Sequence, residues 1–200
     1  MKNLIAIFFL SLLLSTSKTT AQEFTDNGTN KERRFGYCAS YYSVKNSSFG
    51  WQIGIENYLA TTKNYQVIGS LNLSNYFVKD IYTAAALNPR IGFRYINNFG
   101  LVLENFIGFG YLHRFYKYND YGVNANGDVV SKRKASQGSA MPNFMLGAGY
   151  NLENKLKIPI MAVVRGSLNY NYPNRHYIFE TYFSLEAGIV YRPNFKNNTK

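Results

Sequence analysis

Residues 177–192, with the sequence YIFETYFSLEAGIVYR, alternate between apolar and polar side chains along their whole length. The odd-numbered positions are nearly all apolar, whereas the even-numbered positions include Glu180, Glu186 and Arg192. A period of two is typical of a β-strand whose two faces meet different surroundings. Because most strands in globular proteins have only about five or six residues, this length indicates a segment that crosses a lipid bilayer at a tilt.

The same alternation recurs along most of the chain. Between the alternating segments lie short stretches that favour turns, such as KNSS at 45–48, TTKN at 61–64 and NNFG at 97–100. The predicted strands span residues 34–43, 49–60, 65–78, 83–97, 100–118, 139–152, 158–172 and 177–192. Eight long strands joined in sequence predict an all-β fold, an eight-stranded antiparallel up-and-down transmembrane β-barrel.

Two kinds of barrel produce this alternation. A soluble barrel points its apolar face inward, whereas an outer-membrane barrel turns that face to lipid. The polar face here holds Gly, Ser, Asn, Tyr, Glu and Arg with almost no lysine, although a water-exposed face usually has many lysines. An arginine on the lipid face at the bilayer centre costs roughly 2–4 kcal/mol, so the charged faces are expected to point inward. A soluble periplasmic ligand-binding barrel with an apolar lumen is the alternative.

The inward charges are expected to form a paired network, because a buried charge without a partner is very costly. The members of this predicted lumen network are Glu56, Arg90, Arg94, Glu104, Arg114, Arg165, Glu180, Glu186 and Arg192. Side chains just fill the interior of an eight-stranded barrel, so the network is expected to plug it and leave no open pore. An ion path or a set of catalytic carboxylates is the alternative.

The N-terminal residues have the features of a targeting segment. Lys2, the apolar run LIAIFFLSLLL at 4–14 and the small residues TTA at 19–21 predict a secretory signal peptide over residues 1–21. An uncleaved anchor is the alternative. The expected organisation continues with a flexible leader at 22–33, the barrel at 34–195 and a C-terminal tail at 196–200. Export and the barrel pattern together predict the outer membrane of a Gram-negative bacterium.

The longest predicted connection, residues 119–138, is expected to face the outside, because both termini of an eight-stranded barrel lie in the periplasm. It carries Lys132, Arg133 and Lys134, which are candidates for contact with lipopolysaccharide phosphates or an acidic partner. A solvated loop is the alternative. The formal net charge is +11, but the basic residues are scattered, which argues against nucleic-acid binding.

The sequence contains no Gly-rich phosphate-binding loop, no nucleophile elbow and no HExxH metal-binding motif. Two histidines and the lone Cys38 cannot build a conventional zinc site or an internal disulfide, so no metal and no cofactor are expected. The enzyme alternative is a lipid A hydrolase or acyltransferase, since His113 lies toward the outer end of the fifth strand. In the deacylase motif that this region resembles, a serine lies two positions after the histidine, and here that position is Phe115.

Two segments, PNFMLGAGYNL at 142–152 and LEAGIVYRPNF at 185–195, resemble the small outer-membrane β-barrel families, as do the eight alternating strands. These families are the transmembrane part of outer membrane protein A with its eight-stranded relatives, and the outer membrane protein β-barrel domain group common in Bacteroidota. The second segment is similar to the C-terminal assembly signal read by the barrel-insertion machinery, with Gly188, Tyr191 and Phe195 in matching places, although Pro193 interrupts it.

This resemblance implies a structural or surface-interaction role without catalysis, although the fold itself hosts many functions. It implies outer-membrane lipid and lipopolysaccharide as surroundings. The protein would act as a monomer or as a subunit of a larger envelope complex, for example one for secretion or conjugation.

Overall fold

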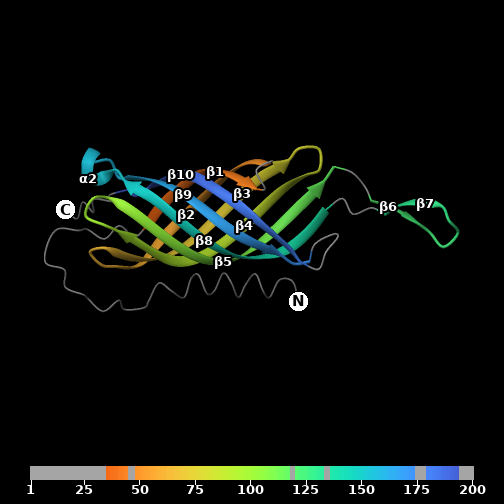
Figure 1. The fold of residues 1–200 in the computed structure, drawn as a ribbon, viewed down its shortest axis with the longest axis horizontal. Helices are drawn as coiled ribbons and strands as arrows, with labels where there is room; N and C mark the ends of the chain where they lie inside the picture. The colour runs from red at the N-terminus through yellow and green to blue at the C-terminus, as the bar shows by residue number, and fades with distance from the viewer. Residues whose placement is uncertain (1–34, 45–47, 118–119, 133–135, 174–178, 194–200) are drawn as a thin grey trace, which may run out of the picture. The chain divides into compact units, whose positions relative to one another are not determined.

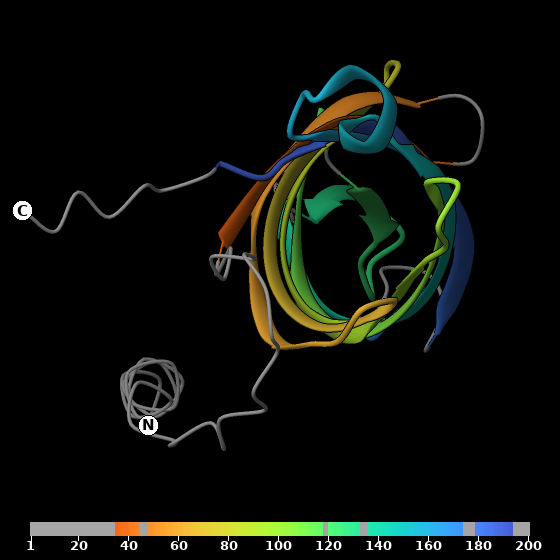
Figure 2. The same cartoon turned by 90° about the vertical axis from the view of Figure 1, so that its left-hand side faces the viewer.

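The computed structural model describes residues 35–44, 48–117, 120–132, 136–173 and 179–193. Within them, eight long strands close into a barrel (Figure 1, Figure 2). These strands are β1 (Phe35–Val44), β2 (Ser48–Thr61), β3 (Tyr65–Val78), β4 (Tyr82–Ile96), β5 (Leu101–Tyr116), β8 (Ser136–Asn151), β9 (Ile160–Asn171) and β10 (Glu180–Tyr191). Their order around the barrel is β1-β10-β9-β8-β5-β4-β3-β2, and every neighbouring pair is antiparallel.

The structure confirms the eight-stranded antiparallel barrel that the sequence predicts, and each strand boundary lies within three residues of its expected place. The connection at 119–138 differs from the expected loop, because it contains a hairpin of β6 (Asp120–Val123) and β7 (Val129–Lys132). Asn124 closes its turn by accepting hydrogen bonds from the backbone N–H groups of Asn126 and Asp128. Gly127 adopts the left-handed φ of 89° that such turns require.

The connections divide between the two ends of the barrel (Figure 1). One end, named the turn end, carries the connections 62–64, 97–100 and 152–159, the last of which includes the short helix α2 (Glu153–Leu156). The other, named the hairpin end, carries the connection 79–81 and the β6–β7 hairpin. No helix among the described residues has the length and apolar character needed to cross a membrane.

Side chains in the eight strands alternate between a buried inward face and an exposed outward face. At the outward positions of these strands, all of which the structure describes, there is no Asp, Glu, Lys or Arg. Large apolar side chains occupy this wall instead; Phe93 is 59% exposed and Ile107 is 61% exposed. Closure of the barrel pairs both edges of every strand, so the sheet has no free edge.

Two outward prolines, Pro89 in β4 and Pro142 in β8, interrupt the hydrogen-bond ladders. The β4–β5 ladder omits the pairs at residues 88 and 89, and the β8–β9 ladder omits those at 141 and 142. Proline has no N–H to donate, which accounts for each gap. The register is the same on both sides of each gap, so the barrel stays closed.

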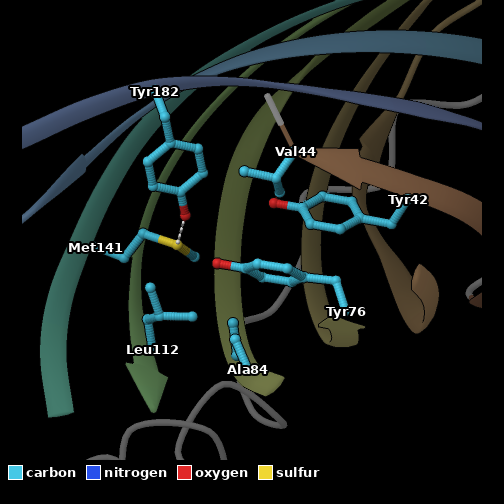
Figure 3. Close-up of a cluster of buried hydrophobic side chains, with 8 residues drawn as sticks. Tyr42, Val44, Tyr76, Ala84, Leu112, Met141 and Tyr182 are labelled. Atoms are coloured by element: carbon cyan, nitrogen blue, oxygen red, sulfur yellow. Dashed lines mark hydrogen bonds between the residues drawn. The ribbon is translucent and has the colours of Figure 1, made fainter. Parts of the chain in front are cut away.

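A buried cluster fills the interior at the hairpin end (Figure 3). This cluster, named the tyrosine cap, consists of Tyr42, Val44, Tyr76, Ala84, Ala86, Leu112, Met141 and Tyr182. The Tyr182 hydroxyl donates to the sulfur of Met141 over 3.1 Å, and the rings of Tyr42 and Tyr76 lie 5.6 Å apart. The tyrosines occupy inward positions, which the sequence pattern marks only as polar.

Candidate functional site

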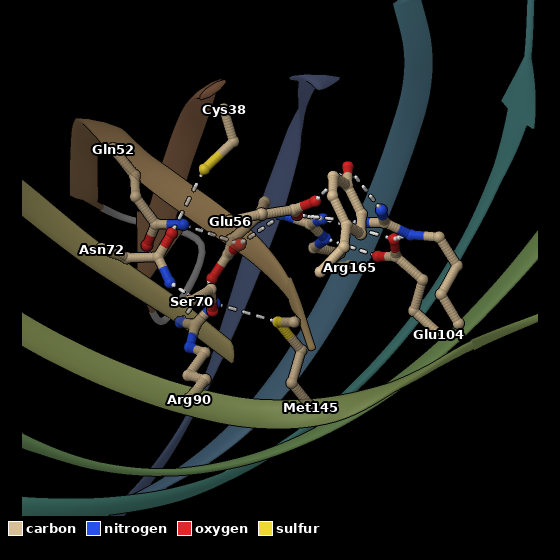
Figure 4. Close-up of polar contacts among 12 residues, drawn as sticks. Cys38, Gln52, Glu56, Ser70, Asn72, Arg90, Glu104, Met145 and Arg165 are labelled. Atoms are coloured by element: carbon tan, nitrogen blue, oxygen red, sulfur yellow. Dashed lines mark hydrogen bonds and ion pairs between the residues drawn. The ribbon is translucent and has the colours of Figure 1, made fainter. Parts of the chain in front are cut away.

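Six charged side chains meet in one buried cluster inside the barrel, and Figure 4 labels four of them, Glu56, Arg90, Glu104 and Arg165. The cluster lies on the turn-end side of the tyrosine cap. Its members are Glu56 of β2, Arg90 and Arg94 of β4, Glu104 of β5, Arg165 of β9 and Glu186 of β10. None of them is more than 5% exposed. Three carboxylates face three guanidinium groups, so this interior charge cluster has no net charge when all six are ionised.

Four members form a closed ring of alternating charge. Arg94 bonds to Glu56 over 2.9 Å and also to Glu104. Arg165 bonds to Glu104 over 2.7 Å and to Glu56 over 3.1 Å. The hydroxyl of Tyr58 donates to Glu56 over 3.2 Å and accepts from Arg94 over 3.3 Å. Because these residues come from four different strands, the ring joins opposite walls of the barrel across its interior.

The remaining pair of the cluster is Arg90 with Glu186, at 2.8 Å. Gln52 donates to the second oxygen of Glu186 over 2.9 Å, and Arg165 approaches that oxygen to 3.9 Å, which links the pair to the ring. Arg90 also donates to the sulfur of Met145 over 3.1 Å. Each carboxylate of the cluster therefore has hydrogen-bond donors on both of its oxygens, the arrangement that a buried ion pair requires.

Gly147 makes room for the ring. It lies in register between Glu104 on β5 and Arg165 on β9, at an inward position of β8. A Cβ atom added there would lie 2.9 Å from Cγ of Arg165 and 3.1 Å from an oxygen of Glu104. The absence of a side chain lets Glu104 and Arg165 meet across β8. The role of Gly147 was not foreseen, although a glycine at an inward position between two strands that carry inward charges is a signal that the sequence contains.

The other three residues of the predicted network lie apart from the cluster. Arg114 pairs with Glu180 at 2.7 Å near the hairpin end, where the Glu180 side chain is 19% exposed. Arg192 lies at the turn end, where it bonds to Glu153 of α2 over 3.1 Å and to Asn151 over 2.9 Å. Glu153 was not foreseen, because the sequence places it in a turn and not on a strand.

The predicted assembly-signal residues fall partly on β10. Gly188 lies opposite Ser40 of β1, and a Cβ atom added to it would lie only 2.3 Å from the carbonyl oxygen of Ala39. This glycine therefore lets β1 and β10 approach closely where the barrel closes. Tyr191 pairs with Tyr37 and is 44% exposed on the outward wall.

Several expectations fall on residues outside those described. They are Phe195, the signal peptide at 1–21, the leader at 22–33 and the tail at 196–200. In the predicted external contact, Lys132 ends β7, whereas Arg133 and Lys134 lie outside the described residues.

His113 lies on the outward wall near the hairpin end. A hydrogen bond of 3.1 Å joins its Nδ1 to the hydroxyl of Tyr111, and the ring of Phe115 lies 4.6 Å from its own. Both neighbours, Tyr111 and Phe115, are aromatic, and neither supplies the serine hydroxyl of the deacylase motif. In the described part of the chain, no group of three or more His, Cys, Asp and Glu side chains is placed to hold a metal ion.

Comparison with solved structures finds chains that are similar to this one. Neisserial surface protein A (NspA) matches with a TM-score of 0.52 and 10% identity, over 80% of this chain and 95% of that chain. Ail, the attachment invasion locus protein of Yersinia pestis, has a TM-score of 0.41 and 13% identity, over 78% of this chain and 93% of that one. The β domain of the Bordetella autotransporter BrkA has a TM-score of 0.40 and 14% identity, over 82% of this chain and 72% of that chain.

No protein-family model matches the chain, and a comparison with curated proteins finds no match. The resemblances to outer membrane protein A and to the Bacteroidota group stay predictions. At 10% identity, the likeness to NspA bears on the fold alone. The chain therefore has the fold of a closed, eight-stranded antiparallel β-barrel, similar to that of neisserial surface protein A.

Proposed function

We propose that this protein is an integral outer-membrane barrel with a sealed interior and a structural or surface-interaction role. The observation that carries the proposal is the outward wall, which has no Asp, Glu, Lys or Arg on any of the eight strands. Soluble monomers rarely expose contiguous apolar patches beyond a few hundred Å². Moving one large apolar side chain from water into hydrocarbon gains about 1.5–3 kcal/mol, and this wall carries such side chains on every strand.

Aromatic side chains on the wall support a bilayer crossing. Toward the hairpin end, Phe49 lies 6.4 Å from Tyr41 and 6.0 Å from Phe77, measured between ring centroids. At the turn end, Tyr65 and Tyr95 lie 5.0 Å apart. Aliphatic outward residues lie between these two groups on the same strands. Aromatic belts at the two interfaces, with an aliphatic band between them, are typical of membrane barrels.

The interior supports a sealed barrel and disfavours both a pore and a lipid-filled lumen. Salt bridges cross the lumen in the interior charge cluster, and the tyrosine cap lies between this cluster and the hairpin end. A soluble barrel that holds a lipid would have the opposite arrangement, with an apolar lumen and charges outside. We therefore assign the interior charge cluster a bracing role, in which its salt bridges stabilise the barrel by joining opposite walls.

The hairpin end supports a surface-interaction role. The β6–β7 hairpin exposes Tyr121 and Val129, at 73% and 72%, and the sequence continues into the basic run at 132–134. A two-stranded hairpin is at best marginally stable in water, so an apolar face on it favours contact with another surface. Lipopolysaccharide phosphates or an acidic partner would complement the basic run.

Fractionation of cells tests this proposal. After a carbonate wash, the protein is expected in the outer-membrane fraction, and folded protein in planar bilayers is expected to give no stable conductance steps. Recovery in the soluble fraction would contradict membrane integration. Steady porin-like steps would contradict the sealed interior alone.

A further inference from the structure

Three asparagines lie at outward positions of the eight barrel strands, all of which the structure describes. Asn57 lies at the turn end, opposite Phe35, which is the first residue of β1. Asn75 lies toward the hairpin end, two residues before Phe77 of the aromatic group there. Near the two ends of the wall, a polar side chain can reach headgroups and water. The third asparagine, Asn105 of β5, lies between these two ends and has a different environment.

The side chain of Asn105 is exposed within an apolar part of the wall. Leu103 and Ile107 flank it on β5, and Phe93 of β4 and Leu146 of β8 lie opposite it. The backbone N–H of Phe93 donates to Oδ1 of Asn105 over 3.3 Å. The described residues supply no hydrogen-bond acceptor to its Nδ2 group. Hydrocarbon supplies none either, so this amide favours contact with another polar group.

The wall protrudes around this amide. Four neighbouring side chains are between 56% and 61% exposed, namely Phe93, Ile107, Leu146 and Val164. The large apolar outward side chains of β1 and β10 are at most 51% exposed. Ala148, which lies opposite Leu103 and Val164, is small and stands next to Asn105. The surface here therefore combines protruding apolar side chains with a low area at Asn105 and Ala148.

We propose that Asn105 lies at the centre of a contact between two copies of this chain. This inference rests on the proposed function, because copies inserted in one membrane share an orientation and are related by a two-fold axis along the membrane normal. A residue beside such an axis meets the same residue of the other copy. An amide both donates and accepts, and its oxygen has two lone pairs. Each Nδ2 group therefore donates to Oδ1 of the other copy, which still accepts from Phe93.

The apolar surroundings suit the same contact. Side chains that protrude from one copy pack over the low area at Asn105 and Ala148 of the other, as knobs fill holes between packed helices. Within a membrane, small residues at a contact allow close approach, and hydrogen bonds between chains add to the packing. A lipid acyl chain covers the apolar side chains equally well, but it offers the amide no acceptor. The amide thus favours a second copy over lipid.

Energy transfer between labelled barrels in lipid vesicles tests the proposal. Two pools of the full-length protein carry a donor or an acceptor dye through Tyr121→Cys on the hairpin, in a Cys38→Ser background, and added lipid dilutes them. Asn105→Leu removes the amide with little change in volume. Asn75→Leu is the matched control, the same change at an outward position toward the hairpin end. Heat-modifiable migration on gels shows that each variant is folded.

We expect the wild type and Asn75→Leu to form dimers that dissociate on dilution with lipid. Asn105→Leu should raise the dissociation constant about tenfold, a factor that corresponds to about 1.4 kcal/mol and lies within the range of hydrogen bonds between membrane-spanning segments. Asn105→Gln keeps the amide and should retain most of the association. Ala148→Trp keeps Asn105 but fills the low area beside it, and it should also weaken the dimer.

Wild-type barrels that show only the energy transfer of random collisions would overturn the proposal, and so would equal association of Asn105→Leu and the wild type. Monomeric barrels that retain a different membrane protein after mild extraction from native membranes would overturn the second copy as the occupant. In all of these outcomes the protein still lies in the membrane. Absence of the wild-type protein from carbonate-washed membranes would instead overturn the proposed function itself.

Discussion

Glu104→Gln tests the interior charge cluster most directly, because it removes the charge of one carboxylate and changes the shape of the side chain very little. The carboxylate accepts hydrogen bonds from Arg94 and, over 2.7 Å, from Arg165, and both arginine side chains are at most 4% exposed. The substitution leaves three guanidinium groups against two carboxylates, so the buried cluster gains one uncompensated positive charge. Breaking a buried pair from one side costs about 3–5 kcal/mol, and we expect the free energy of unfolding to fall by that amount.

Urea titration of the barrel in lipid vesicles measures this loss. Heat-modifiable migration on gels reports the folded fraction, and fluorescence of Trp51, the only tryptophan, reports unfolding independently. Asp80→Asn is the matched control, because Asp80 also pairs with a cation, Lys117 at 3.5 Å, but the two side chains are 69% and 51% exposed. An exposed pair contributes about 0–1 kcal/mol, so the control is expected to stay near the wild type.

A second variant separates charge imbalance from a general loss of packing. Glu104→Gln combined with Arg94→Gln restores two carboxylates against two guanidinium groups. We expect the double variant to lose less stability than the sum of the two single variants, because residues in one network couple. If Glu104→Gln alone stayed within about 0.5 kcal/mol of the wild type, the bracing role of the cluster would be wrong.

Three further substitutions test other parts of the structure. Gly147→Val should destabilise the barrel by about 1–3 kcal/mol in urea titration, because the new side chain crowds Arg165 and Glu104, and an unchanged midpoint would contradict the packing at β8. Gly188→Val should lower the yield of heat-modifiable barrel, since its Cβ meets the carbonyl oxygen of Ala39 at 2.3 Å; a normal yield would show that this closing pair tolerates a side chain. Ile107→Arg places a charge on the wall and should cost roughly 2–4 kcal/mol in vesicles, whereas no cost would argue against lipid at that position.

The alternation of side chains was enough to predict the barrel and the face on which each charge lies. A period of two fixes the inward and outward sides of a whole strand, because a slip by one residue would turn its apolar face into the interior. The individual pairs, such as Arg94 opposite Glu104, depend also on the length of the turn that joins the two strands. The β6–β7 hairpin was missed, because four-residue strands give too little alternation to separate them from a loop.

The sequence could not predict which inward residues contact each other across the lumen. Glu56 meets Arg94 and Arg165, which lie on strands that are not its neighbours, and the stagger of the closed barrel decides which inward residues share a level. Arg192 was expected in the same network, but it is the first residue after β10 and reaches Glu153 on the turn-end connection instead. The tyrosine cap was not foreseen, since inward tyrosines satisfy the polar pattern while they pack as apolar groups.

Spin-label accessibility along β5 tests most directly whether the wall faces lipid. Labels are placed at the outward positions 103, 105, 107 and 109 in a Cys38→Ser background, with Tyr121 on the exposed hairpin as the aqueous control. In reconstituted vesicles, we expect collisions with oxygen, which concentrates in hydrocarbon, to dominate at all four wall positions. Collisions with a water-soluble nickel chelate should dominate at Tyr121. Dominant nickel collisions at the four wall positions would place this face in water and contradict the membrane barrel.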